Sequence, residues 1–155
     1  MHILMCNDDG ILADGLRHLA SYLSQYYRIT VVAPANEQSA KSHALTTEVP
    51  LKLDACNGED ENPRLYALTG TPSDCMKFGL SYLLTDDMPD LVISGINHGF
   101  NLGSDVLYSG TVSAAMESGF YGIPGLALSV ERYSVERGDE MHPFIHELIE
   151  KIYVA

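Results

Sequence analysis

The sequence has few basic residues, few cysteines and no long apolar run. Nine Lys and Arg stand against 21 Asp and Glu, which gives a formal net charge of −12. A surface this acidic repels a polyanion such as duplex DNA, so we expect no DNA partner. The three scattered cysteines, Cys6, Cys56 and Cys75, exclude a disulfide framework and favour reduced core thiols and a cytoplasmic location. No stretch approaches the roughly 18 apolar residues of a membrane span or resembles an export signal, so no membrane partner is expected.

What the chain does contain is enough apolar material for one core. Its 155 residues fit a single domain, residues 1–155, because domains commonly hold roughly 100–200 residues. The apolar fraction of 46% can build a sizeable core. The polar segment 54–63 carries a glycine and a proline and is predicted to be a surface loop between two short strands, in a hairpin.

Short apolar runs alternate with helical patterns along the chain. Strands are predicted at 2–6, 29–33, 91–93 and 126–130, and helices at 14–26, 72–83, 111–120 and 142–153. Thr71 followed by Pro72 is typical of a helix start, with an N-cap and a proline at the first helical position. Strands that alternate with helices predict a parallel sheet with right-handed crossovers, in a doubly wound α/β fold.

The run Asn7-Asp8-Asp9-Gly10 directly follows the first predicted strand. Two adjacent carboxylates repel each other unless a cation or a shared proton relieves them, so Asp8 and Asp9 indicate a divalent metal site. Ligands in open α/β sheets sit beyond the carboxyl ends of the strands. Ser39 and Asn97 follow two other predicted strands and add a hydroxyl and an amide oxygen. Such oxygen donors suit Mg²⁺ or Mn²⁺.

A second candidate site begins with the loop through Asn101, which runs into Ser109, Gly110 and Thr111. A glycine at this point lets the backbone approach a ligand closely, and the N-terminus of the following helix presents unpaired N–H groups. These features predict a phosphate-binding loop.

Each of these patterns also has a purely structural interpretation. Asp8 and Asp9 are ordinary turn residues before a glycine, with side chains that cap the turn. Ser39 is equally compatible with a loop hydroxyl, and Asn97 with a residue that turns the chain at the end of a strand. Ser109 is a good helix N-cap, which is compatible with phosphate binding.

Other polar residues are predicted to be structural. The segment 71–74 is interpreted as a helix start and not as a catalytic group. His43 and His98 lie near the predicted crevice, but a lone histidine is more often a surface or hydrogen-bonded residue. His142 and His146 share a helical face, as zinc ligands do, but no third ligand accompanies them, so solvated positions are expected.

Five motifs, in this order, resemble the survival protein SurE family: 7–10 (NDDG), 70–75 (GTPSDC), 94–97 (SGIN), 101–103 (NLG) and 108–112 (YSGTV). The resemblance implies a Rossmann-like three-layer sandwich and a metal-dependent phosphatase that hydrolyses nucleoside monophosphates, a 5′/3′-nucleotidase. It implies a homodimer or tetramer. It also implies metal ligands at Asp8, Asp9, Ser39 and Asn97, of which Asp8, Asp9 and Asn97 are catalytic, and phosphate contacts at Asn101, Ser109, Gly110 and Thr111.

The chain also departs from the pattern of that family. SurE proteins usually continue for roughly another hundred residues, so a shortened or fragmentary chain is expected. Asp14 stands where the family commonly has proline, and the segment 36–38 lacks a common basic residue. The missing basic residue weakens the expected attraction for phosphate.

Two further classes of function remain open. One is a nucleotide- or metal-binding module without catalysis, which follows from the short chain. The other is a receiver-type signalling domain, since such domains also bind magnesium through acids after the first strand. It ranks last, because a receiver needs a lysine after the fifth strand and the only late lysine, Lys151, lies in the last predicted helix.

Overall fold

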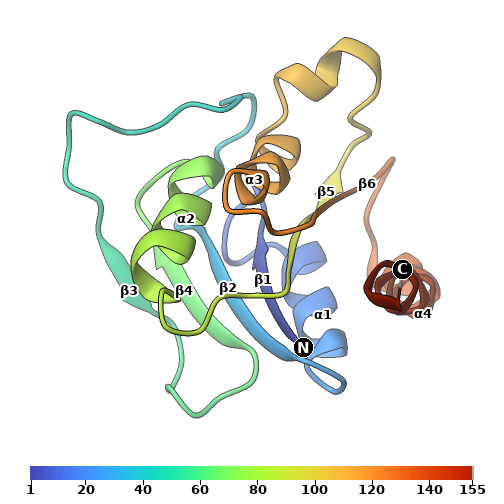
Figure 1. Cartoon of the computed structure of the whole chain (residues 1–155). Coiled ribbons are helices and arrows are strands. Elements are labelled where there is room, and N and C mark those ends of the chain that lie inside the picture. Colours follow the sequence, from blue (N-terminus) through green and yellow to red (C-terminus); the bar gives the residue numbers. More distant parts are fainter. Residues whose placement is uncertain (155) are drawn as a thin grey trace.

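The computed structural model of the chain describes residues 1–154 and contains one six-stranded sheet between two layers of helices (Figure 1). The strand order is β3-β4-β2-β1-β5-β6, and all neighbours pair in parallel except β3 and β4. The strands are β1 (His2–Cys6), β2 (Arg28–Pro34), β3 (Leu53–Ala55), β4 (Arg64–Leu68), β5 (Leu91–His98) and β6 (Gly125–Val130). The predicted α/β fold is confirmed, including the antiparallel β3–β4 pair, although the loop between them covers 56–63 and begins two residues later than predicted.

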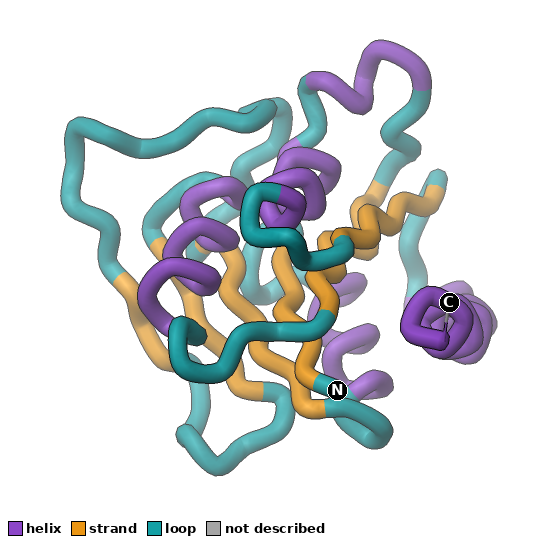
Figure 2. The backbone as a smooth tube through the Cα atoms, in the orientation of Figure 1, coloured by secondary structure: helices purple, strands orange, loops and turns teal. Residues whose placement is uncertain are grey.

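Helices cover both faces of the sheet (Figure 2). One face carries α1 (Asp14–Leu23) and α4 (Val135–Val154), and the other carries α2 (Pro72–Phe78), the π-helical turn η1 (Gly79–Leu83) and α3 (Gly110–Gly119). A short 3-10 helix, η2 (Gly103–Leu107), belongs to an excursion that projects from the body of the molecule (Figure 1). None of the helices within residues 1–154 is long and apolar enough to cross a membrane.

The central strand β1 is buried along its whole length. Ile3 and Met5 face the core shared with α1 and α4, while Leu4 and Cys6 face the core shared with α2 and α3. A parallel strand covered on both faces needs apolar side chains on both, which is why this segment has a nearly continuous apolar run. β1 also marks the point where the strand order reverses, since β2 lies on one side of it and β5 on the other.

With η1 counted as the end of the predicted helix 72–83, two helix boundaries differ from the prediction by more than one residue. Helix α1 ends at Leu23, three residues early, because tight turns close the chain there: Tyr26 N–H donates to the Leu23 carbonyl at 3.0 Å. Helix α4 begins at Val135, seven residues early, with the Ser134 hydroxyl accepting from Arg137 N–H at 3.3 Å. It contains Pro143, a residue that usually breaks a helix.

Of the two histidines of α4, His142 is not solvated, so the prediction was wrong for this residue, whereas His146 is only half-buried. His142 is buried, and its ring centroid lies 5.1 Å from that of Tyr22. His146 stacks on Tyr26 with the centroids 4.2 Å apart. The two rings therefore help to dock α4 against α1 and its C-terminal turn.

All three cysteines are free thiols. Cys6 and Cys75 are buried, as predicted for core thiols, and burial raises the pKa of the Cys75 thiol well above its ordinary value. Cys56 is exposed, so the prediction of a core position was wrong for this residue. It directly follows β3, the edge strand of the sheet, whose own residues are mostly exposed.

We predict that the free energy of unfolding falls as the pH drops from about 7.5 to about 5.5, partly through His142. Burial lowers the pKa of this imidazole from 6.5, with the nearby Asp139 charge acting in the opposite direction. When the pH falls below the ordinary imidazole pKa, His142 of the unfolded chain therefore binds a proton that His142 of the folded chain does not. His142→Leu should make the pH dependence smaller, although the lowered pKa of His2 leaves part of it in place.

The measurement is urea unfolding at both pH values, with Phe144→Leu, an exposed site on the same helix, as the control. An identical fall in stability in wild type and His142→Leu would contradict the assignment.

Candidate active site

A tight turn follows β1 and is closed by Asn7. The Asn7 side chain accepts a hydrogen bond from Gly10 N–H at 3.2 Å and donates one to the Gly10 carbonyl at 3.0 Å. The capping role that was an alternative for the two acids is therefore filled by the preceding residue. Asp8 and Asp9 are left free for another role.

Asp8 is held against the N-terminus of α3. The residue is 5% exposed, and its carboxylate accepts a hydrogen bond from the Thr111 hydroxyl at 2.6 Å. A β-carbon added to Gly110 would lie 2.9 Å from the Asp8 β-carbon, closer than real contacts allow. Only glycine at position 110 permits this approach, so strand and helix are packed together at the aspartate.

Asp9 is half-buried beside Asp8 and turns toward the end of β5. Burial raises the pKa of the Asp9 carboxyl, and the neighbouring Asp8 charge raises it further. A hydrogen bond from His98 main-chain N–H acts in the opposite direction. The pair therefore carries more negative charge than its neutral neighbours balance, and a cation here would relieve the repulsion.

The loop after β2 approaches the other side of the turn. Gln38 main-chain N–H donates to the Asp8 carbonyl at 2.7 Å. Ser39, the next residue, is exposed, and its hydroxyl donates to Glu37 at 2.6 Å. The loop is also tied to the excursion around η2, because the Ser42 hydroxyl donates to the Leu107 carbonyl at 2.8 Å. Ser39 thus lies beside the turn but makes the loop contact that was its alternative interpretation.

The end of β5 is irregular, and this irregularity decides which residues approach the turn. The pairing with β6 shifts register between Ser94 and Asn97. Gly95, at φ +128°, could not carry a side chain, since an added β-carbon would lie 2.3 Å from the Leu128 carbonyl oxygen. Beyond this bulge the Asn97 amide donates to the Gly99 carbonyl at 2.8 Å, which leaves its side-chain oxygen available as a ligand.

The predicted phosphate-binding residues do not all gather at one point. Ser109 is the N-cap of α3 and accepts from Val112 N–H at 3.2 Å. The N–H groups of Gly110 and Thr111 belong to the same first turn, for which the helix supplies no acceptor. Asn101 is tied to β6 instead, through a 2.8 Å hydrogen bond to the Ser129 hydroxyl.

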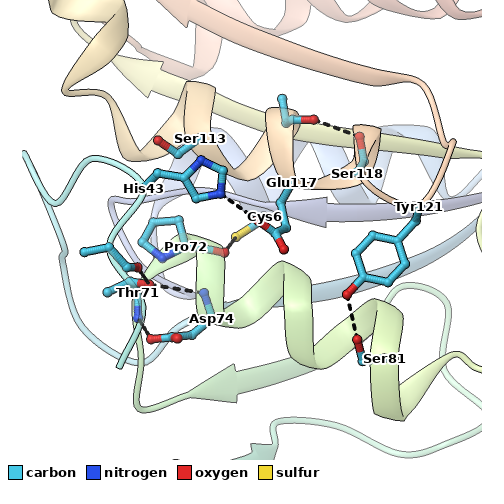
Figure 3. A network of polar contacts seen from close by, with 12 residues as sticks. Cys6, His43, Thr71, Pro72, Asp74, Ser81, Ser113, Glu117, Ser118 and Tyr121 are labelled. Atoms are coloured by element: carbon cyan, nitrogen blue, oxygen red, sulfur yellow. Dashed lines mark hydrogen bonds and ion pairs between the residues drawn. The ribbon is translucent and has the colours of Figure 1, made fainter. Parts of the chain in front are cut away.

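A polar network behind the site supports α2 (Figure 3). The Asp74 carboxylate accepts from Thr71 N–H at 2.9 Å and from the Thr46 hydroxyl at 2.6 Å, while Asp74 N–H donates to the Thr71 hydroxyl at 3.1 Å. This geometry supports the interpretation of the segment 71–74 as structural, because it caps the helix and anchors the loop after β2.

One pair near this network could not be foreseen from the sequence. His43, on the loop after β2, lies 2.6 Å from the carboxylate of Glu117, which is 4% exposed on α3 (Figure 3). The small and apolar residues around Glu117 give no indication in the sequence that this acid has a partner. His43 reaches it only through the fold of the loop after β2. The pair fastens the loop to the helix that carries Thr111.

The donor set fits a hard divalent cation. Within residues 1–154 no three His, Cys, Asp or Glu side chains cluster as they would around zinc. The available donors at the turn are two carboxylates, the Asn97 amide oxygen and, one residue from the Gln38 contact, the Ser39 hydroxyl. Oxygen donors of this kind, with few charges, are the usual ligands of Mg²⁺ or Mn²⁺.

Proteins that carry the same name are similar to this chain in sequence. A 5′-nucleotidase SurE of Thermoanaerobacter sp. (strain X514) is 49% identical over 152 residues, which are 98% of this chain and 60% of that protein. The 5′-nucleotidase SurE of Vibrio vulnificus (strain YJ016) is 50% identical over 130 residues, 84% of this chain and 49% of that protein. The chain therefore spans about 60% or less of the length of these relatives.

The structural comparison agrees. The crystal structure of the SurE protein from Aquifex aeolicus superimposes with a TM-score of 0.85 at 38% identity, over 98% of this chain and 60% of that one. The family model described as survival protein SurE matches residues 3–155. With nearly the whole chain matched, the protein belongs to the SurE family.

Proposed function

We propose that the protein is a metal-dependent phosphomonoesterase that hydrolyses nucleoside monophosphates to nucleoside and phosphate. The family and the relatives named 5′-nucleotidase SurE support this activity. The observation that carries the proposal is the contact of Asp8 with Gly110 and Thr111, since it joins a carboxylate pair to a helix N-terminus. A cation on the carboxylates and a phosphate on the helix N-terminus would then be neighbours.

The residues divide into two groups in this proposal. The metal ligands are Asp8, Asp9, Asn97 and Ser39, and the phosphate contacts are Ser109, Gly110, Thr111 and Asn101. Ser39 and Asn101 would turn from their present partners, Glu37 and Ser129, to reach the ligand. When bound, the cation would lower the pKa of a water molecule and offset phosphoryl charge.

The two aspartates have different tasks in the reaction. Asp8 is fixed by the Thr111 hydroxyl, so it serves to position. Asp9 is half-buried, and within residues 1–154 its carboxylate accepts no hydrogen bond from another side chain, which suits it to accept a proton from the attacking water. The N–H groups of Gly110 and Thr111 stabilise charge on the phosphoryl oxygens in an in-line transition state.

The substrate and location follow from the same chemistry. The net charge of −12 disfavours large nucleic acids but not a small ester held by a cation and neutral donors. Free thiols at Cys6, Cys56 and Cys75 support a cytoplasmic location. We also propose that the protein assembles into a homodimer or tetramer, as the SurE resemblance implies.

The first prediction of the proposed function concerns the carboxylate pair. Asp9→Asn should lower phosphate release from nucleoside 5′- and 3′-monophosphates by about 100-fold or more, because it removes the proton acceptor and a metal ligand. Release is measured with Mn²⁺, Mg²⁺ or EDTA, and circular dichroism checks the fold. Asp60→Asn, an exposed acid in the loop between β3 and β4, is the control.

Activity retained in Asp9→Asn would remove the pair from the mechanism. If folded wild type releases no phosphate with any metal, the non-catalytic binding module is the better description.

The second prediction concerns the approach of α3 to β1. Gly110→Ala should lower the rate by about 10- to 100-fold, since the added methyl group must push Asp8 away from its position. Gly119→Ala, at the other end of the same helix, meets no atom within 4 Å and should leave the rate unchanged. Equal rates for the two variants would show that the close approach is not needed for turnover.

A further inference from the structure

A cavity of about 250 Å³ opens beside the candidate active site at the carboxyl ends of β2 and β4. It is formed by the first residues after β2, the loop that returns past Thr46, and the turn that leads from β4 into α2. Its lining residues are Ala35, Asn36, Gln38, Thr46, Val49, Leu68, Thr69, Gly70 and Thr71.

Two contacts connect this cavity to the carboxylate pair. Gln38 lines the cavity, and its main-chain N–H donates to the Asp8 carbonyl at 2.7 Å. On the other side, Thr71 lines the cavity and precedes Pro72, whose ring lies within 3.0 Å of the position of a β-carbon on Gly110. The cavity therefore lies next to a ligand whose phosphate binds at Gly110, because both Gln38 and Thr71 line it.

The lining is neutral and partly committed. Among the described residues, no lining side chain carries a charge. The hydroxyls of Thr46, Thr69 and Thr71 already hydrogen-bond within the protein. Within residues 1–154, the side-chain amides of Asn36 and Gln38 have no such partner. These two amides are thus the free hydrogen-bonding groups of the cavity.

We propose that this cavity receives the base of the nucleotide and that Asn36 and Gln38 bind its edge. The proposal rests on the proposed function. A second phosphate would need cationic groups, which the lining lacks, and a metal ion would need carboxylates. An amide offers one donor group and one acceptor, as does the edge of a nucleobase. The exposed side chain of Val49 supplies apolar surface for the face of a ring.

The volume agrees with a small group. Pockets for drug-sized ligands hold roughly 300–1,000 Å³, so about 250 Å³ suits one heterocycle and not a dinucleotide. Because the cavity opens at the side of the turn, the phosphate and the base are bound by different groups. The phosphate is held through main-chain N–H groups and a cation, while the base is held through side-chain amides.

The test compares esters with and without a base. Gln38→Ala and Asn36→Ala should each raise KM for nucleoside monophosphates about three- to tenfold, as loss of one neutral hydrogen bond does, and leave KM for phenyl phosphate unchanged. The Gln38 substitution keeps the main-chain N–H that holds Asp8. Gln25→Ala, an exposed amide at the opposite end of the sheet, is the control.

A binding measurement separates this proposal from the proposed function. Dissociation constants of free adenosine and uridine are measured by NMR titration of the protein, which needs no turnover. Weaker nucleoside binding in Gln38→Ala, with wild-type affinity in Gln25→Ala, supports the cavity even if no ester is hydrolysed. Equal nucleoside affinity in wild type and in both cavity variants would overturn it, even if hydrolysis is normal.

Discussion

The hydrogen bond from the Thr111 hydroxyl to Asp8 is the interaction on which the site depends. It joins residues 103 positions apart, at the place where the central strand ends and α3 begins. Asp8 is buried, and a carboxylate is costly to bury without partners, whereas a hydrogen bond to a charged group contributes roughly 1.5–3 kcal/mol. The absence of a side chain at Gly110 makes the contact possible, so fold and site share one packing constraint.

The protein holds its two acids with neutral groups. Among the described residues, no Lys or Arg forms an ion pair with Asp8 or Asp9. The Asp8 carboxylate accepts from the Thr111 hydroxyl, and the Asp9 carboxyl accepts from His98 main-chain N–H, so these partners fix geometry without cancelling charge. Burial and the neighbouring Asp8 charge raise the pKa of Asp9. A site balanced by its own lysines would have little affinity for a cation, whereas this one keeps the repulsion that a cation can relieve.

The sequence was informative where structure is local and silent where it is tertiary. Apolar runs located β1, β2 and β6 to within a residue or two, and Thr71 with Pro72 marked the start of α2. The early start of α4 was missed, because Gly138 and Pro143 suggest a break that burial of the helix against α1 overrides. Asp8 and Asp9 were singled out from the sequence, whereas the contact of Gln38 with Asp8 and the bond between Asp8 and Thr111 have no local signature.

The loop between β2 and β3 connects these features. It contacts the turn after β1 through Gln38, α3 through His43 and α2 through Thr46, so one irregular segment touches the turn and both helices beside it. The loop covers residues 35–52, and connections this long are uncommon in compact domains unless they have a function. Because the same loop carries Ser39 and lines the cavity, any movement of it changes the proposed metal site and the proposed base site together. Affinity for the cation and for the nucleoside should therefore be coupled through this segment.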